Sequence, residues 1–242
     1  MPPVTAAPGV FTGFRPEAIQ FLADLAQNND RAWFQPRKAE FERLIKQPME
    51  ELCVALEDEF RARDIPLHAD PGRSPFRIYR DTRFSKDKTP YKTAAAASFS
   101  WAGDGADATA GRSHTESVHA SGGYFHLQPG EIFAGGGVWH PDKAWLDAFR
   151  QRIVSDLDGF KRIVDAPAFA DTFGSVSDDG ESLKRVPQGY PPDHPAADLL
   201  RKKNLTFGRR LSDDEALSPS LPTLLADTFA AGTPLMRYLA TL

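Results

Sequence analysis

The stretch RIYRDTRFSKDKTPYKT, residues 77–93, stands out from the rest of the sequence. Before its final threonine it carries a local charge of +4, although the whole chain has a formal net charge of −4. Two tyrosines and a phenylalanine lie between the charges, which argues against a freely solvated tail. We therefore predict a strand that enters a tight basic loop and leaves it as a second strand. The basic residues are Arg77, Arg80, Arg83, Lys86, Lys88 and Lys92.

The residues before this stretch predict helices. Apolar side chains recur at helical spacing in residues 14–26, 31–46 and 49–63. Asp30 is placed to cap the second helix, and Pro48 is expected to end it and to begin the third. Aromatic faces of amphipathic helices are normally buried, so we assign these faces to the core.

Residues 76–79 and 93–100 are the strands expected on either side of the basic loop. Residues 123–128 alternate in polarity, Pro129 and Gly130 signal a turn, and residues 131–139 return, which predicts a hairpin. Three consecutive glycines in the returning strand are costly in backbone entropy. They indicate a bulge, or a place where another backbone or a ligand comes close.

The remainder of the chain predicts further helices at residues 142–154, 157–164, 167–171, 196–201 and 221–239, the last one broken or kinked near Pro234. Short strands are expected at residues 183–186 and 205–207. No repeat and no linker divides the chain. We predict one α+β domain over residues 11–242, a mostly antiparallel sheet with N-terminal and C-terminal helices packed on it, and a flexible segment at residues 1–10.

Composition excludes several classes of protein. Hydrophobic residues make up 41% and charged residues 26% of the chain, and no apolar run approaches the ~20 residues that span a bilayer. The first residues do not resemble a secretory signal. Cys53 is the single cysteine, so no intrachain disulfide can form, and we expect a small core residue in a cytoplasmic protein. The mildly acidic balance makes nucleic acid an unfavourable partner.

Metal and cofactor sites are not predicted. His114 and His119 lie in or beside a polar segment, residues 102–117, without a carboxylate or cysteine at a supporting spacing. The glycine triplet is neither a phosphate loop nor a dinucleotide fingerprint. We expect the polar segment to form a surface loop.

Taken together, these motifs resemble the conserved family catalogued as domain of unknown function 2461. The resemblance covers roughly residues 11–239, and the polar segment 102–117 is the one departure from it. It implies a single mixed domain without an established activity, and it supplies no catalytic residues. It rests on residues 21–34 (FLADLAQNNDRAWF), 77–93, 122–137 (GGYFHLQPGEIFAGGG), 183–195 (LKRVPQGYPPDHP) and 199–205 (LLRKKNL).

Crowded cations repel one another unless something negative neutralises them, so the basic stretch predicts a site for a small phosphate- or carboxylate-bearing ligand. His126, on the same side of its strand as Tyr124, is the candidate for acid–base chemistry. Salt bridges to Asp30, Glu40 or Glu42 are an alternative, as is a protein-interaction module that docks an acidic partner through the basic loop. The candidate ligand-binding residues are Arg77, Arg80, Arg83, Lys86, Lys88, Tyr91, Lys92, Tyr124, His126, Gly135, Gly136 and Gly137.

Overall fold

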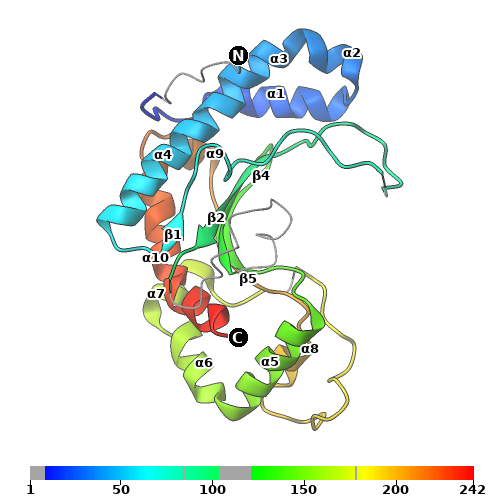
Figure 1. Cartoon of the computed structure of the whole chain (residues 1–242), viewed down its shortest axis with the longest axis vertical. Coiled ribbons are helices and arrows are strands. Elements are labelled where there is room, and N and C mark those ends of the chain that lie inside the picture. Colours follow the sequence, from blue (N-terminus) through cyan, green and yellow to red (C-terminus); the bar gives the residue numbers. More distant parts are fainter. Residues whose placement is uncertain (1–8, 84, 104–120, 178) are drawn as a thin grey trace.

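A five-stranded antiparallel sheet with strand order β1-β2-β3-β4-β5 forms the centre of the computed structural model, which describes residues 9–83, 85–103, 121–177 and 179–242. Each strand pairs with the next along the chain (Figure 1). The predicted hairpin is confirmed, with Gln128 opposite Glu131 and Gly130 at a φ of 75° in the turn. The strands are β1 (Leu67–His68), β2 (Ala95–Trp101), β3 (Gly122–Gln128), β4 (Glu131–Val138) and β5 (Leu205–Arg210).

Helices precede, interrupt and follow the strands in chain order. The N-terminal set is α1 (Pro16–Gln27), α2 (Arg31–Phe34), η1 (Gln35–Arg37), α3 (Lys38–Phe41), η2 (Glu42–Lys46) and α4 (Gln47–Ala62). Between β4 and β5 lie α5 (Lys143–Ser155), α6 (Leu157–Val164), α7 (Pro167–Phe173) and α8 (Ala197–Arg201). The chain ends with α9 (Asp213–Leu217) and α10 (Leu221–Ala240).

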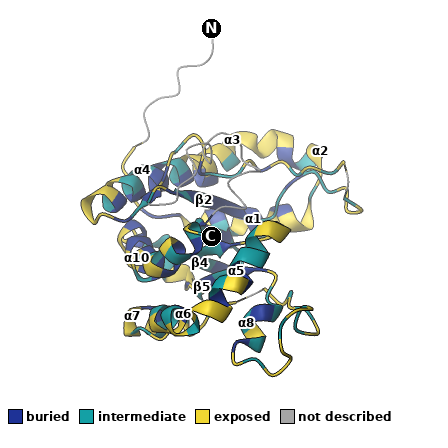
Figure 2. Ribbon diagram, turned by 60° about the horizontal axis from the view of Figure 1, so that its bottom comes forward, coloured by how far each residue is buried: buried dark blue, intermediate teal, exposed yellow. Residues whose placement is uncertain are grey.

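The two faces of the sheet differ. Phe125 of β3 is buried and stacks on Phe14 before α1, with ring centroids 6.2 Å apart. Phe99 of β2 meets Phe229 of α10 at 5.3 Å. Buried residues gather on the strands and on the inner sides of α4 and α10, while the outer sides of the helices are exposed (Figure 2).

The opposite face carries the alternate residues of each strand, and none of the described helices lies over it in Figure 1. On β3 these residues are Tyr124, His126 and Gln128, all partly buried. We call this side of the sheet the open face. It is the only large surface of the sheet, among the described residues, where polar side chains project from a rigid support.

Three expectations about secondary structure are wrong. Residues 76–79 do not form a regular strand. Pro75 bridges Ala97 and Tyr79 bridges Tyr91, so four positions on one side face six positions on the other, and a regular ladder cannot connect the two bridges. Residues 183–186 form no strand, since Leu183 makes a single backbone bond, to Arg201. The last helix is unbroken through Pro234, because side chains before and after it are buried in the same core.

The junction at Pro48 also differs from expectation. The chain stays helical there and widens into the π-helical turn η2, in which the N–H of Gln47 donates to the carbonyl of Glu42. Pro48 has no N–H to give to the carbonyl of Leu44, so the wider turn satisfies the backbone in another way. One continuous helical rod results.

The chain therefore folds as a single α+β domain, as predicted. No described helix is both long and apolar enough to cross a membrane. Cys53 is fully buried among the helices, and burial raises the pKa of its thiol. The expected flexibility of residues 1–10 and the expected surface loop at residues 102–117 fall largely outside the described residues.

Candidate functional site

The basic stretch forms a hairpin, residues 78–92, which we call the arm. Its base is closed by two backbone hydrogen bonds, from Lys92 to the carbonyl of Ile78 and from Arg80 to the carbonyl of Pro90. In Figure 1 the arm extends away from the sheet beyond the ends of the strands. The predicted unit of two extended segments around a basic loop is thus present, but it projects and does not lie flat on the sheet.

Hydrogen bonds of one side chain and the stacking of two rings fix the arm to the N-terminal helices. The amide of Asn29 donates to the carbonyl of Tyr91 at 2.9 Å and accepts from its N–H at 3.0 Å, as a neighbouring strand would. The ring of Tyr91 is buried and stacks on Phe34, with centroids 4.1 Å apart. Tyr91, a candidate ligand-binding residue, therefore lies in the core and holds the arm in place.

Replacing Asn29 by alanine is expected to lower the free energy of unfolding by about 1–3 kcal/mol, because two backbone groups of the arm lose their partners. Urea denaturation of the variant measures this loss. Asn28→Ala is the matched control, since the exposed amide of Asn28 only donates to the carbonyl of Asp24 within its own helix. Equal losses in the two variants would contradict the role of Asn29.

The outer cations of the arm are neutralised by its own aspartates. Arg80 bonds Asp87 and Thr89, and its hydrogen bond lowers the pKa of Asp87 to about 2. Arg83 binds Asp81 through two nitrogens, at 2.7 and 3.0 Å, and lowers the pKa of that carboxyl to about 2. These ion pairs form within the arm, not with the carboxylates of the N-terminal helices.

The remaining cations near the tip are exposed. Lys88 donates to the carbonyl of Thr82 at 2.8 Å, and Lys86 forms no hydrogen bond or ion pair with any described residue. Neither side chain forms a described hydrogen bond or ion pair with a residue of the open face. The structure thus separates the six predicted cations into an outer group on the arm and an inner pair at its base.

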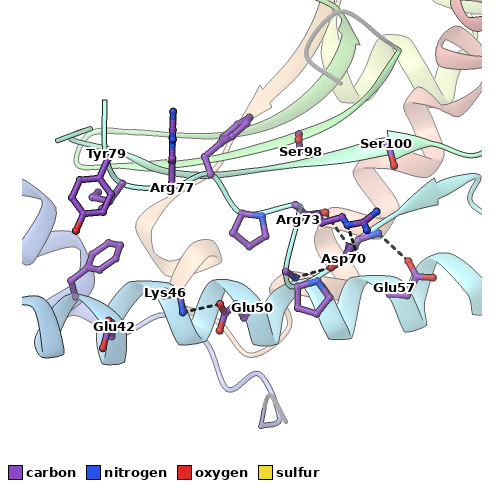
Figure 3. A pocket seen from close by; sticks show the side chains of 18 of the residues that line it. Glu42, Lys46, Glu50, Glu57, Asp70, Arg73, Arg77, Tyr79, Ser98 and Ser100 are labelled. Carbon is purple, nitrogen blue, oxygen red and sulfur yellow. Dashed lines mark hydrogen bonds and ion pairs between the residues drawn. The ribbon is translucent and has the colours of Figure 1, made fainter. Parts of the chain in front are cut away.

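The inner pair consists of Arg77 and Lys92. The ammonium of Lys92 lies 4.8 Å from the centre of the Phe76 ring. Burial, and secondarily the charge of Arg77, lower the pKa of Lys92. Within the described part of the chain, neither side chain forms an ion pair with a carboxylate. Figure 3 shows the Arg77 side chain pointing away from α4.

Four rings follow the inner pair across the open face, and we call them the ring row: Phe76, Tyr124, His126 and Phe133. Phe76 and Tyr124 have centroids 6.1 Å apart, and Tyr124 lies 5.7 Å from Phe133. His126 stacks on Phe133 at 4.8 Å with an interplanar angle of 20°. All four are partly exposed. The row joins β3, β4 and the segment before the arm.

His126 is held by its own strand. Its Nδ1 lies 3.0 Å from the hydroxyl of Tyr124, and its Nε2 lies 3.3 Å from Oε1 of Gln128. Since Oε1 can only accept, Nε2 carries the proton and Nδ1 accepts from Tyr124. Burial lowers the pKa of His126 and raises the pKa of Tyr124 to about 12. Both groups are therefore neutral at pH 7, and His126 has no free ring nitrogen to act as a base.

The glycine triplet is explained by packing between backbones. A Cβ atom on Gly135 would lie 2.0 Å from the carbonyl oxygen of Phe207, and one on Gly137 would lie 2.2 Å from that of Leu205. On the other side, a Cβ on Gly136 would lie 2.5 Å from the carbonyl oxygen of Gly122. The register of β4 is continuous with both neighbours, so there is no bulge. Close approach of neighbouring strands accounts for all three glycines without a ligand.

A groove of about 1100 Å³ lies between the helical rod η2–α4 and residues 68–79, and Phe76 and Arg77 belong to its lining (Figure 3). Three of its four cations form ion pairs, and the fourth is Arg77: Lys46 pairs with Glu50 at 3.3 Å, and Arg73 pairs with Asp70 at 3.8 Å. Lys38 likewise pairs with Glu42 at 3.7 Å. Four cations and four carboxylates line it, so it does not favour an anion. The groove brings together segments that are distant in the sequence, and no sequence pattern predicts it.

The sequence interpretation missed Phe76 and Phe133 of the ring row and one cation of the open face. Arg210 of β5 lies opposite Phe133 in register and is exposed, which places a third cation beside the ring row. The strand predicted there ended at residue 207, three residues too early. Among the described residues, no group of three or more His, Cys, Asp or Glu side chains could hold a metal ion. His114 and His119 lie outside those residues.

Comparison with known proteins places this fold in a family. The model of a conserved hypothetical protein family (DUF2461) matches residues 17–238, nearly the whole described chain. The chain belongs to that family. The match runs from α1 to α10 and so includes the arm, the ring row and the groove. No curated protein and no solved structure matches the chain. DUF2461 membership identifies the domain, and its description names no activity.

Proposed function

We propose that this DUF2461 domain binds a small phosphate- or carboxylate-bearing ligand on its open face, at the inner pair. The observation that carries the proposal is that the charge of the exposed Arg77 acts on the partly buried Lys92, while neither forms an ion pair with a described carboxylate, although Arg77 also acts on the Asp81 carboxyl at longer range. Two neighbouring cations repel each other, and partial burial strengthens the repulsion because water screens it less. A bound anion removes that penalty.

The chemistry of the surrounding groups fits such a ligand. A guanidinium offers two parallel donors to a carboxylate or phosphate, and an ammonium adds a compact point charge. Tyr124 stays uncharged over the whole physiological pH range because burial raises its pKa to about 12, so it does not repel an anion, and its hydroxyl proton is donated to His126. The proposed site is therefore built from Arg77, Lys92, Tyr124 and the ring of His126.

This proposal is narrower than the one drawn from sequence. Arg80 and Arg83 are held by carboxylates of the arm, and Tyr91 belongs to the core. His126 is assigned to binding, since both of its ring nitrogens are engaged. We propose a binding domain without a catalytic step. A cytoplasmic location belongs to the same proposal, supported by the single cysteine.

Removing one cation of the inner pair tests the site. Titration with inorganic phosphate, followed by calorimetry at low ionic strength, should show binding that Lys92→Met weakens at least tenfold, about 1.4 kcal/mol. Lys86→Met is the matched control, because it removes the same charge from the exposed arm. Absence of phosphate binding, or equal weakening in both variants, would contradict the proposal.

A second candidate function is the docking of an acidic protein segment by the arm. The observation in its favour is the exposure of the arm: the Arg83 side chain is 77% exposed and Lys86 and Lys88 are exposed too. Binding of a synthetic polyglutamate peptide should then weaken with Lys86→Glu and Lys88→Glu but not with Lys92→Met. The opposite pattern would leave only the small-ligand site.

A further inference from the structure

We propose that the ligand of the open face is an aromatic anion, whose charged group meets the inner pair while its ring lies on the ring row. This inference rests on the proposed function and adds the class of ligand to it. It concerns an aryl phosphate or an aryl carboxylate, which share a flat apolar body and a terminal negative charge.

The ring row is an aromatic surface outside the core. The core rings of this protein, such as Phe34, Phe99 and Phe125, are fully buried on the covered side of the sheet or among the helices. The four rings of the row instead lie on the open face and keep part of their surface in water. Contiguous partly exposed rings on a rigid support are typical of a surface that stacks flat ligands.

The neighbours of the row leave it accessible. Across β2, the residues in register with His126 and Tyr124 are Ala96 and Ser98, whose side chains are too short to cover the rings. Across β4, the partner of Tyr124 is Gly135, which has no side chain. The rings therefore stand above a floor of small residues. The floor alone specifies no ligand, but it leaves room for a flat molecule beside Tyr124.

The cations adjoin one end of the row. Lys92 lies over Phe76, and Phe76 is the ring next to Tyr124. An anionic group held by Lys92 and Arg77 therefore lies next to the aromatic surface that Phe76 and Tyr124 form. Arg210, at the other end beside Phe133, is a single exposed cation, so we assign the anionic group to the inner pair.

The edge of His126 completes the surface. Tyr124, His126 and Gln128 are joined by hydrogen bonds at spacings of two residues along β3, which fixes the imidazole ring against Phe133. A ring fixed in this way loses little freedom when a ligand stacks on it, so more of the contact energy contributes to affinity.

Three probes of similar charge test this inference: inorganic phosphate, methyl phosphate and phenyl phosphate. Phenyl phosphate should bind the wild-type protein about tenfold more tightly than methyl phosphate, equivalent to about 1.4 kcal/mol. Benzoate compared with acetate repeats the test for a carboxylate. The pair in which the aromatic member binds more tightly than its methyl counterpart by the larger factor identifies the anionic group. Proton NMR should show the ring resonances of His126 shifting with phenyl phosphate and not with methyl phosphate.

Variants separate the two parts of the site. Phe133→Leu keeps an apolar side chain and removes the ring. The preference for phenyl phosphate over methyl phosphate should then fall to less than threefold, while the binding of inorganic phosphate stays unchanged. Phe173→Leu is the control, an equal change in a partly buried ring of α7 that contacts Phe169 and Phe207 and no ring of the row. Lys92→Met should weaken all three probes, and Arg210→Met should weaken them less.

The possible failures are distinguishable. If inorganic phosphate binds but phenyl and methyl phosphate bind equally, the aromatic class is wrong and the anion site stands. If no probe binds, the proposed function and this inference both fall. A phenyl advantage that survives Phe133→Leu in a protein with a wild-type melting temperature would place the ring elsewhere and overturn the inference.

Discussion

Gly135→Ala is expected to lower the free energy of unfolding by more than about 4 kcal/mol, enough to leave much of the protein unfolded in water. The added Cβ would lie 2.0 Å from the carbonyl oxygen of Phe207 and 2.7 Å from the Cα of Gly208, both backbone atoms. Neither atom can move without pushing β5 away from β4. Circular dichroism during urea denaturation measures the loss.

Gly208→Ala is the control, since it adds the same methyl group on the facing strand. Its Cβ would meet the carbonyl oxygen of Ala134 at 3.2 Å, close enough to require a shift of a few tenths of an ångström. We expect a loss of about 1 kcal/mol from this change. A protein that tolerates Gly135→Ala as well as Gly208→Ala would show that the two strands do not approach as closely as described.

Phe34→Ala carries the second large expected effect, a loss of about 3–5 kcal/mol, because the ring is fully buried and its removal leaves a cavity. The ring is the platform on which Tyr91 stacks, so the base of the arm should loosen as well. Hydrogen exchange of the Lys92 N–H, which donates to Ile78, should accelerate more than exchange in β3.

Tyr79→Ala provides the comparison for that variant. The ring of Tyr79 also contacts Phe34, with centroids 6.5 Å apart, but it is 45% exposed. Its removal leaves little cavity, so the expected loss is about 1 kcal/mol. Unchanged exchange at Lys92 in Phe34→Ala would show that the arm is held independently of the aromatic core.

The regular parts of the fold could be predicted from local patterns. The alternation in residues 123–128, with Pro129 and Gly130 after it, determines both the hairpin and the face to which each side chain points. The capping box of Ser212 and Glu215 is also a local signal, and it marks the start of α9, a helix absent from the predictions above. The irregular pairing of residues 75–79 could not be predicted, because it depends on how their spacing differs from that of residues 91–97, a segment more than ten residues away in the sequence.

The candidate site could be predicted only in part. Sequence placed Arg77, Lys92, Tyr124 and His126 among the binding residues, and these lie at or beside the open face. It could not show that Asp81 and Asp87 neutralise their neighbours, since a charge count does not state which groups meet. Nor could it pair Asn29 with Tyr91 across 62 positions, a contact that exists only after the helices have packed.

The amide of Asn29 also joins the turn between α1 and α2 to the proposed binding site. It forms two hydrogen bonds with the backbone of Tyr91, and the next residue in the chain is Lys92. An anion bound by the ammonium would restrain the side chain of Lys92, and we expect part of that restraint to reach the adjoining Tyr91 backbone and so the helical turn. If the proposed anion binds there, slower amide exchange at Tyr91 is the expected result.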